Sequence, residues 1–296
     1  LSGVMIDVGE SRFYPDREAS ASILGYVGIV SNQEVARDPL LQLPGFRVGK
    51  AGMEKVHDVA LRGKGGTSQV EVNAFGREIR ELSRIEGQRG SEAWLTIDSE
   101  LQKFVAKRLG ERPASAVVMD VHTGEVLALV STPSFDPNIF NKGLSQADWK
   151  QLISNPHSPL TNKAIAGQYA PGSVFKMVVA LAALEKGVIS KNFQVLCNGE
   201  IELGESTFHC WRIKGHGHMD LFNAIAQSCD VFFYEIALRT GIDRIAAMAR
   251  RLGLGQKFKI ELPGEKAGLI PTRAWKRKVK GSKWQQGETL LAGIGQ

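Results

Sequence analysis

The sequence contains no uninterrupted apolar stretch of about 18 residues, which a membrane-spanning helix requires. It also lacks the basic start and apolar run of a signal peptide. No internal repeat, low-complexity tract or nucleic-acid-binding motif is present, and no motif for an organic cofactor is found. These absences exclude a membrane-embedded bundle and a repeat protein, and they predict neither nucleic acid nor an organic cofactor as a ligand.

Both ends of the sequence are expected to be those of a fragment. Leu1 is not an initiator methionine, and the last residues, Gly295 and Gln296, interrupt a pattern rather than complete one. A length of 296 residues is too great for one small core, so two domains are expected.

The first third of the chain has glycines and short β-prone runs. A strand is expected over residues 22–30, a short helical stretch from Gly49 to about Arg62, and a hairpin formed by residues 70–73 and 78–82. The polar residues 85–91 are expected to mark a boundary. The predicted domains are therefore residues 1–91 and 92–296.

The second domain is expected to begin with strands and continue with helices. The expected elements are a strand at 94–97, a helix to Leu109 capped by Asp98 or Ser99, a hairpin of 116–120 and 126–131 buried on both faces, and helices from Ser173, Leu221, Val231 and Asp243. This order predicts an α+β fold with a mainly antiparallel sheet flanked by helices.

Ser173 and Lys176 form an S-x-x-K pair at the start of an apolar helix, after Pro171 and Gly172. Backbone N–H groups in a first helical turn are unpaired and favour an oxyanion beside the serine. Lys176 lies on the same helical face, so its amine is expected to reach the hydroxyl and act as its base. The alternative is that Ser173 only caps a helix and Lys176 is a surface residue.

Ser228, Cys229 and Asp230 supply a second element between two apolar helices. Ser228 could relay a proton to a leaving amine, and Asp230 could hold Lys176 through a charge-assisted hydrogen bond. The third element of such a set, K-T-G, is absent and is expected beyond Gln296.

These motifs resemble the S-x-x-K and S-x-N elements of penicillin-binding proteins, with Asp230 where asparagine is usual. The chain is identified as a member of the class B proteins, and its S-x-D form is similar to the penicillin-binding protein 2 branch. Segments similar to the β-rich pedestal domain are residues 12–15, 23–28, 49–54, 61–63 and 70–77. Segments similar to the transpeptidase domain are 96–98, 101–102, 123–128, 133–138 and 293–296, with 215–217 and 271–276 typical of the branch.

The resemblance implies a pedestal followed by a C-terminally incomplete penicillin-binding/β-lactamase-like transpeptidase domain. It implies an acyl-serine peptidoglycan D,D-transpeptidase that cross-links D-Ala–D-Ala stem peptides during cell elongation and is acylated by β-lactams. The implied location is the periplasmic face of the inner membrane, with an N-terminal anchor helix outside this chain. The implied partners are a SEDS-family glycosyltransferase and elongation scaffold proteins. A D,D-carboxypeptidase or β-lactamase-like hydrolase and a catalytically silent scaffold are the alternatives.

The three cysteines, Cys197, Cys210 and Cys229, are an odd number for a periplasmic domain. With His216, in a Gly-His-Gly turn, they give the order C-x12-C-x5-H-x12-C, which provides the four ligands of a structural zinc site. The resemblance to penicillin-binding protein 2 implies a metal site at these positions. A Cys197–Cys210 disulfide with Cys229 buried, or three unrelated core thiols, are the alternatives.

One basic cluster stands out from the net charge of +6. Its members are Arg273, Lys276, Arg277, Lys278, Lys280 and Lys283, interleaved with Trp275 and Trp284. A solvated loop is the preferred interpretation, and a partner-binding surface is the alternative.

Overall fold

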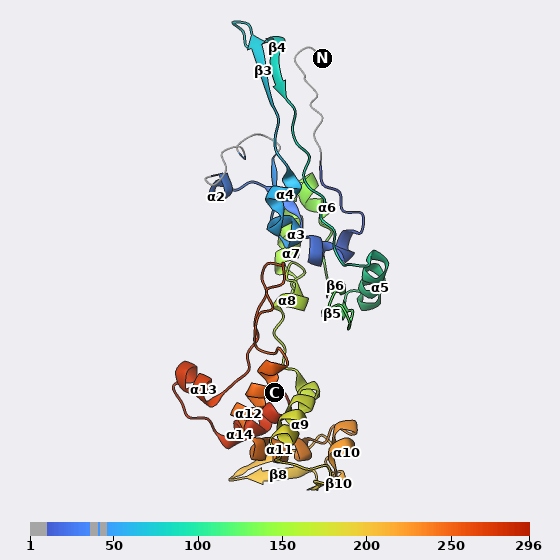
Figure 1. The fold of residues 1–296 in the computed structure, drawn as a ribbon, viewed down its shortest axis with the longest axis vertical. Helices are drawn as coiled ribbons and strands as arrows, with labels where there is room; N and C mark the ends of the chain where they lie inside the picture. Colours follow the sequence, from blue (N-terminus) through green and yellow to red (C-terminus); the bar gives the residue numbers. More distant parts are fainter. Residues whose placement is uncertain (1–10, 36–40, 42–45) are drawn as a thin grey trace. The chain divides into compact units, whose positions relative to one another are not determined.

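A computed structural model describes residues 11–35, 41 and 46–296 of the chain. These residues fall into two compact units, which are described separately (Figure 1). Unit 1 extends to Gly167 and includes Lys259–Glu265, while unit 2 consists of Gln168–Phe258 and Lys266–Gln296. The expected absence of a signal peptide concerns residues 1–10, which lie outside the described residues. Within the described residues, no helix is long and apolar enough to cross a bilayer.

Unit 1 combines short helices with three antiparallel strand pairs, β1–β2, β3–β4 and β5–β6. Its helical elements are η1 (Arg17–Ala19), α1 (Ala21–Leu24), α2 (Asn32–Val35), α3 (Gly52–Val56), α4 (Asp58–Arg62), α5 (Ser99–Leu109), α6 (Asn138–Lys142), α7 (Gln146–Ser154) and α8 (Lys163–Ala166). Its strands are β1 (Val27–Ile29), β2 (Arg47–Gly49), β3 (Thr67–Val72), β4 (Glu78–Ile85), β5 (Ala114–Met119) and β6 (Val126–Thr132).

The strand expected over residues 22–30 is only partly right, because residues 22–24 belong to the helix α1 and the strand β1 covers Val27–Ile29. Gly25 ends that helix at φ 73°, where a Cβ would lie 2.0 Å from the carbonyl oxygen of Ala51. The chain then turns into β1, whose Val27 pairs with Gly49 of β2. The apolar run therefore changes from helix to strand at Gly25, where the nearby Ala51 backbone leaves no room for a side chain.

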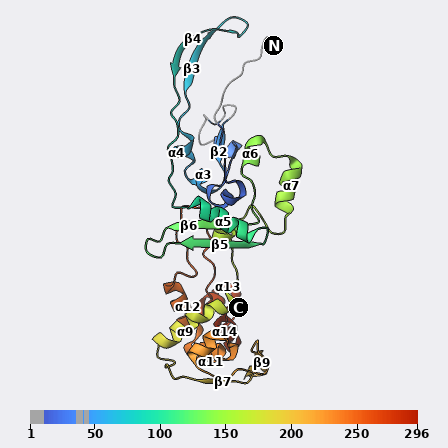
Figure 2. The same cartoon turned by 90° about the vertical axis from the view of Figure 1, so that its right-hand side faces the viewer.

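The expected hairpin of the first domain is confirmed as β3 and β4, which project away from the rest of unit 1 (Figure 2). The Asn73 side chain accepts hydrogen bonds from the N–H groups of Phe75 and Arg77, and Gly76 adopts φ 73° in the turn. Almost every residue of the hairpin is exposed. Backbone pairing and turn chemistry, rather than core burial, hold this element in shape.

The expected strand at 94–97 is not formed, although the segment lies beside β6: Thr96 Oγ1 donates to Val126 O at 2.7 Å. Asp98 caps α5 as predicted, accepting hydrogen bonds from the N–H groups of Glu100 and Leu101. Figure 2 shows α5 alongside the β5–β6 hairpin. That hairpin confirms the expected pair, but β5 alternates between half-buried and exposed residues, so the prediction of burial on both faces is wrong for it.

Side chains from both sides of residue 91 interlock in unit 1. Gln102 of α5 donates from Nε2 to Ala19 O at 2.7 Å and to Leu129 O at 2.8 Å. Asn138 accepts from Tyr14 N–H and donates back to Tyr14 O, both at 2.9 Å. The boundary predicted after residue 91 therefore falls inside a compact unit, and it stays a prediction about evolutionary domains.

Unit 2 is mainly helical and contains the largest buried cluster among the described residues. Its elements are η3 (Gly172–Phe175), α9 (Lys176–Glu185), β7 (Val195–Cys197), β8 (Glu200–Leu203), β9 (Ser206–His209), β10 (Gly217–Met219), α10 (Leu221–Ala226), α11 (Asp230–Thr240), α12 (Ile242–Arg251), α13 (Arg273–Lys280) and α14 (Gln286–Gly293). Helix α11 packs against α9, α12 and α14 (Figure 1). Phe232, Phe233 and Ile236 on α11 are 0% exposed, which makes this helix the centre of the core.

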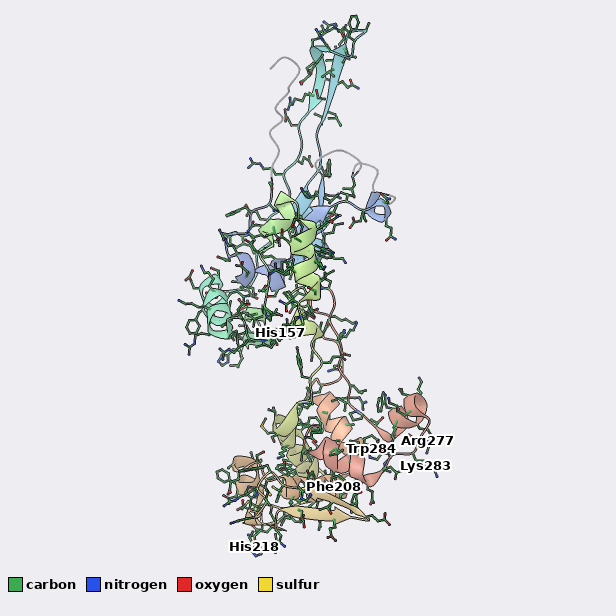
Figure 3. All side chains as sticks on the ribbon, turned by 180° about the vertical axis from the view of Figure 1, so that it is seen from behind. His157, Phe208, His218, Arg277, Lys283 and Trp284 are labelled. Atoms are coloured by element: carbon green, nitrogen blue, oxygen red, sulfur yellow. The ribbon has the colours of Figure 1, made fainter. Side chains whose placement is uncertain are left out.

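The α+β class is confirmed, and every described strand pair is antiparallel. The strands form separate two-stranded ladders in the described residues, with β7 paired to β10 and β8 to β9 in unit 2. The basic cluster is not a loop: most of it forms α13, whose first turn is capped by Thr272 Oγ1 accepting from Trp275 N–H. Arg277 and Lys283 are exposed at the periphery of unit 2 (Figure 3).

Candidate active site

Ser173 lies in the short 3-10 turn η3, immediately before α9 begins at Lys176. Gly172 precedes it at φ 57°, and its N–H donates to Gly295 O at 3.0 Å. Gly295 itself has φ 78°, and a Cβ there would lie 2.1 Å from Gly172 O. Two glycines therefore allow the segment after α14 to touch the backbone of the turn that carries Ser173.

Lys176 is only 2% exposed, although it carries an amine. Its Nζ donates to Asp230 Oδ1 at 2.6 Å, to Ser228 O at 2.9 Å and to Ser228 Oγ at 3.0 Å. The Phe233 ring lies on another side, with its centroid 5.5 Å from Nζ. All three donors of the buried group are satisfied, which excludes the interpretation of Lys176 as a surface residue.

The Ser228 hydroxyl connects Lys176 to Ser173. Ser228 Oγ accepts from Lys176 Nζ and donates to Ser173 Oγ at 2.8 Å. The sequence predicted a direct approach of the amine to the Ser173 hydroxyl, whereas the hydrogen bonds of the structure run through Ser228. The three residues predicted from two separate motifs therefore form one hydrogen-bonded chain.

Ser228 reaches this position in a left-handed backbone conformation, with φ 53°. The turn around it is closed by Ser228 N–H donating to Ile225 O and Cys229 N–H donating to Ala224 O. A non-glycine residue at positive φ is disfavoured and is held by surrounding contacts. Here the conformation directs both the carbonyl and the hydroxyl of one residue at Lys176.

Asp230 begins α11, where a carboxylate is favoured by the helix dipole. Its Oδ1 accepts from Lys176, and its Oδ2 accepts from the Trp211 backbone N–H at 2.9 Å. The Trp211 indole Nε1 donates to the carbonyl oxygens of Gln227 and Ser228, both at 3.1 Å. The sequence analysis did not predict Trp211 as part of this site, although its place next to Cys210 was a signal.

The four predicted metal ligands converge behind the same motif. The ligand atoms of Cys197, Cys210, His216 and Cys229 all lie within 4.8 Å of one another. His216 Nδ1 is 3.5 Å from the sulfurs of both Cys197 and Cys210. The three thiols are free and buried, which contradicts the alternative of a Cys197–Cys210 disulfide.

Close backbone packing brings the four ligands together. Gly217 pairs with Cys197 in the β7–β10 ladder, and Cys210 N–H donates to Gly199 O at 2.7 Å. A Cβ on Gly215 would lie 2.1 Å from Cys197 O, so only glycine fits beside His216. The Gly-His-Gly sequence therefore provides the tight turn that was expected from it.

The pKa values of two members of this thiol cluster are shifted. Burial and the neighbouring Cys197 thiol raise the pKa of Cys229 to about 12. Burial and the nearby Arg212 charge lower the pKa of His216. Among the described residues, His216 Nε2 is buried without a hydrogen-bond partner.

The model of the penicillin-binding protein transpeptidase domain matches residues 114–295, and the model of the penicillin-binding protein dimerisation domain matches residues 1–95. Peptidoglycan D,D-transpeptidase MrdA of Escherichia coli (strain K12) is 38% identical over 301 residues, with 99% of this chain and 48% of the relative covered. MrdA of Acinetobacter baumannii is 37% identical over 297 residues, with 99% of this chain and 44% of the relative covered. The chain thus spans about half the length of these curated relatives.

Two solved structures agree with these matches. One is a complex between penicillin-binding protein 2 and MreC from Helicobacter pylori, with a TM-score of 0.85, 35% identity, and 96% of this chain and 53% of that chain covered. The other is Pseudomonas aeruginosa penicillin-binding protein 2 in complex with WCK 5153, with a TM-score of 0.82, 36% identity, and 98% of this chain and 61% of that chain covered. With its S-x-x-K and S-x-D residues joined in one hydrogen-bonded chain, the protein belongs to the class B penicillin-binding proteins, on the penicillin-binding protein 2 branch.

Proposed function

We propose that the protein is a peptidoglycan D,D-transpeptidase of cell elongation, with Ser173 as its nucleophile. The observation that supports this most strongly is the chain from Lys176 Nζ through Ser228 Oγ to Ser173 Oγ. A serine needs an adjacent base to become nucleophilic, and the Ser228 hydroxyl bridges the Lys176 amine and the Ser173 hydroxyl. The matches to D,D-transpeptidases agree with this chemistry.

In the acylation step, Ser173 Oγ attacks the carbonyl carbon between the two terminal D-alanines of a stem peptide. For this step Lys176 must be unprotonated and the two hydrogen bonds must run in the reverse direction, with Ser173 donating to Ser228 and Ser228 donating to Lys176. The Ser173 proton then passes through the Ser228 hydroxyl to the Lys176 amine. A bond forms between Ser173 Oγ and the carbonyl carbon, and the bond to the terminal D-alanine nitrogen breaks. The proton is returned through Ser228 to that nitrogen, and D-alanine leaves.

In the second step, an amine of a neighbouring stem peptide attacks the acyl carbon. Its excess proton returns to Ser173 Oγ by the same chain, so a cross-link forms and the free enzyme is restored. The Ser173 backbone N–H lies in the first turn of a helical segment, where it can donate to the developing oxyanion in both steps. Asp230 holds Lys176 in place but exchanges no proton in this scheme.

β-Lactams are proposed to acylate Ser173 by the same attack, which opens their ring amide. The Pseudomonas aeruginosa neighbour is described in complex with WCK 5153, and the Helicobacter pylori neighbour in complex with MreC. By analogy, an elongation scaffold protein and a SEDS-family glycosyltransferase are proposed partners of this protein. Its proposed location is the periplasmic face of the inner membrane.

Labelling with a fluorescent penicillin in the full-length gene product tests the proposal. We expect Ser173→Ala to abolish the label, whereas Ser282→Ala, which removes an exposed serine of unit 2, leaves it intact. A wild-type protein that never forms the acyl-enzyme would contradict the proposal and favour a silent scaffold. Rapid turnover of the penicillin would instead indicate a hydrolase.

We also propose that Cys197, Cys210, His216 and Cys229 hold a structural zinc ion. Zinc bonds of about 2.3 Å to sulfur and about 2.0 Å to nitrogen place tetrahedral ligands about 3.5 to 3.8 Å apart. The two 3.5 Å distances from His216 Nδ1 to sulfur fit this geometry. A cation would also stabilise buried thiolates, which burial alone disfavours.

Such an ion would supply structural cross-linking only, because four protein ligands leave no open coordination position. Elemental analysis of protein purified without added metal tests the site, with about one zinc per chain expected. Protein that is folded and penicillin-reactive but free of metal would contradict it. The catalytic proposal does not depend on that outcome.

A further inference from the structure

Trp211 makes two hydrogen bonds to the Ser228–Asp230 motif and a third to Gln227, the residue before it, yet it belongs to neither family motif. Its backbone N–H donates to Asp230 Oδ2, and its indole N–H is shared between Gln227 O and Ser228 O. These contacts join the loop after β9 to the turn between α10 and α11. Trp211 therefore holds this turn through its backbone N–H and through its indole N–H.

The indole contact falls on the strained part of the motif. Ser228 adopts φ 53°, and its carbonyl oxygen accepts from Trp211 Nε1 at 3.1 Å and from Lys176 Nζ at 2.9 Å. A carbonyl that accepts two hydrogen bonds from different directions has little freedom to rotate. Because the hydroxyl of the same residue donates to Ser173, the orientation of this peptide group sets the position of the proton relay.

The backbone contact acts on the other end of the motif. Asp230 has two carboxylate oxygens, and Trp211 N–H binds one of them while Lys176 binds the other. The carboxylate is thereby fixed in rotation, with Oδ1 facing the amine. The two ends of the motif are held by the same loop residue.

Core packing does not explain Trp211, because the residue is 63% exposed. Its ring makes an edge contact with His216, with centroids 5.3 Å apart and planes at 66°. An exposed indole contributes little apolar burial to the core. Its specific contribution at this position is the N–H donor held against the two carbonyl groups.

We propose that Trp211 is a positioning residue for acylation, which holds the Ser228 peptide group so that its hydroxyl bridges Lys176 and Ser173. The proposal rests on the proposed function of Ser173. Trp211 exchanges no proton and forms no bond to substrate in this role. Its effect is therefore expected in the rate of the chemical step rather than in binding of the antibiotic.

Two substitutions separate the hydrogen bond from the shape of the ring. Trp211→Phe removes the N–H and part of the ring, whereas 3-benzothienylalanine at position 211 keeps the bicyclic shape and replaces the N–H with sulfur. The matched control is Trp284→Phe, since Trp284 Nε1 also donates a hydrogen bond, to Thr289 Oγ1 at 2.8 Å, on unit 2. All variants are made in the full-length gene product.

The measurement is stopped-flow acylation by a fluorescent penicillin, resolved into the equilibrium constant of the first complex and the first-order acylation rate constant. We expect both position-211 variants to acylate on the order of tenfold more slowly, the factor that corresponds to one lost hydrogen bond. The equilibrium constant is expected to stay within about twofold of wild type. Trp284→Phe should retain the wild-type rate constant.

A benzothienylalanine variant that acylates at the wild-type rate would overturn the proposal, because shape alone would then suffice. An equal slowing in Trp284→Phe would also overturn it, because the effect would be a general loss of stability. If the wild-type protein itself is not acylated, the proposed function fails instead. The outcomes for Trp211 and for Ser173 are therefore distinguishable.

Discussion

The proposed catalytic residues and the thiol cluster of unit 2 meet at Ser228, Cys229 and Asp230, but the surroundings of their polar groups differ. The Lys176 amine donates all three of its hydrogen bonds to Ser228 and Asp230, and the Ser228 hydroxyl donates to Ser173 Oγ. By contrast, the Cys197 and Cys210 sulfurs lie 3.5 Å from His216 Nδ1, and burial raises the pKa of the neighbouring Cys229 thiol.

The difference shows how each region can be completed. Ser228 and Asp230 accept all the hydrogen bonds of the Lys176 amine, so the protein itself completes this arrangement. The thiol cluster places three sulfurs and one nitrogen around a common point, and a cation is the species that would satisfy them. Substitutions at four positions test this contrast, and they are ordered by their expected effect on acylation.

Lys176→Met should have the largest effect on the catalytic residues. It removes the proposed base and leaves the largely buried Asp230 carboxylate without the hydrogen bond from Lys176. Acylation by penicillin is expected to fall about a thousandfold, within the range for general base catalysis. The fluorescence of labelled protein after timed incubation measures this, and a variant that labels within tenfold of the wild-type rate would rule out Lys176 as the base.

Ser228→Ala and Ser228→Gly should each reduce acylation about a hundredfold, because both remove the bridging hydroxyl. The two variants differ at φ 53°, where glycine is unstrained and alanine costs about 1 kcal/mol. We therefore expect a higher melting temperature for Ser228→Gly than for Ser228→Ala. Equal melting temperatures would argue against strain at this position, while a normal rate in either variant would argue against the relay.

Gly295→Ala should slow acylation about tenfold by displacing the turn of Ser173. The new Cβ would clash with Gly172 O, in addition to the cost of its φ of 78°. Gly281→Ala is the matched control, since Gly281 has φ 65° but no atom within 4 Å of a Cβ. Similar rate constants for the two variants would show that the contact with Gly172 does not position the nucleophile.

His216→Ala should have the smallest effect on acylation, about threefold, but should abolish zinc binding. His209→Ala is its matched control, because His209 is exposed, pairs with Glu200 and lies next to Cys210 without joining the cluster. Elemental analysis and melting curves with and without a chelator measure the outcome. Retained zinc in His216→Ala, or lost zinc in His209→Ala, would contradict the proposed ligand set.

The sequence predicted the elements that local chemistry specifies. The Asp98 cap of α5 and the hairpin of β3 and β4 depend on contacts between residues close in the sequence, and both are confirmed. The apolar run at residues 22–30 was harder, since the change from α1 to β1 depends on the distant backbone of Ala51. Tertiary contacts of that kind leave no periodic pattern in the sequence.

The same distinction holds in the candidate site. The S-x-x-K spacing placed Ser173 and Lys176 near each other, and the cysteine spacing selected four residues that do converge. The bridge through Ser228 and the contacts of Trp211 were not predicted, because the motifs indicate which residues meet but not how their hydroxyl, carbonyl and N–H groups are oriented. The catalytic and metal-binding roles of these residues stay predictions until the variants are measured.

The S-x-D pattern leaves its middle position open to any residue, but in this protein Cys229 occupies it with 0% exposure. Its neighbours on either side direct their polar groups toward Lys176, while its own sulfur lies among those of the thiol cluster. Cys229, at the variable position of the pattern, therefore links the thiol cluster to the two residues that contact Lys176. Substitutions of Cys229 should therefore be included when variants are screened for altered acylation by penicillin, although they change neither the proposed nucleophile nor its proposed base.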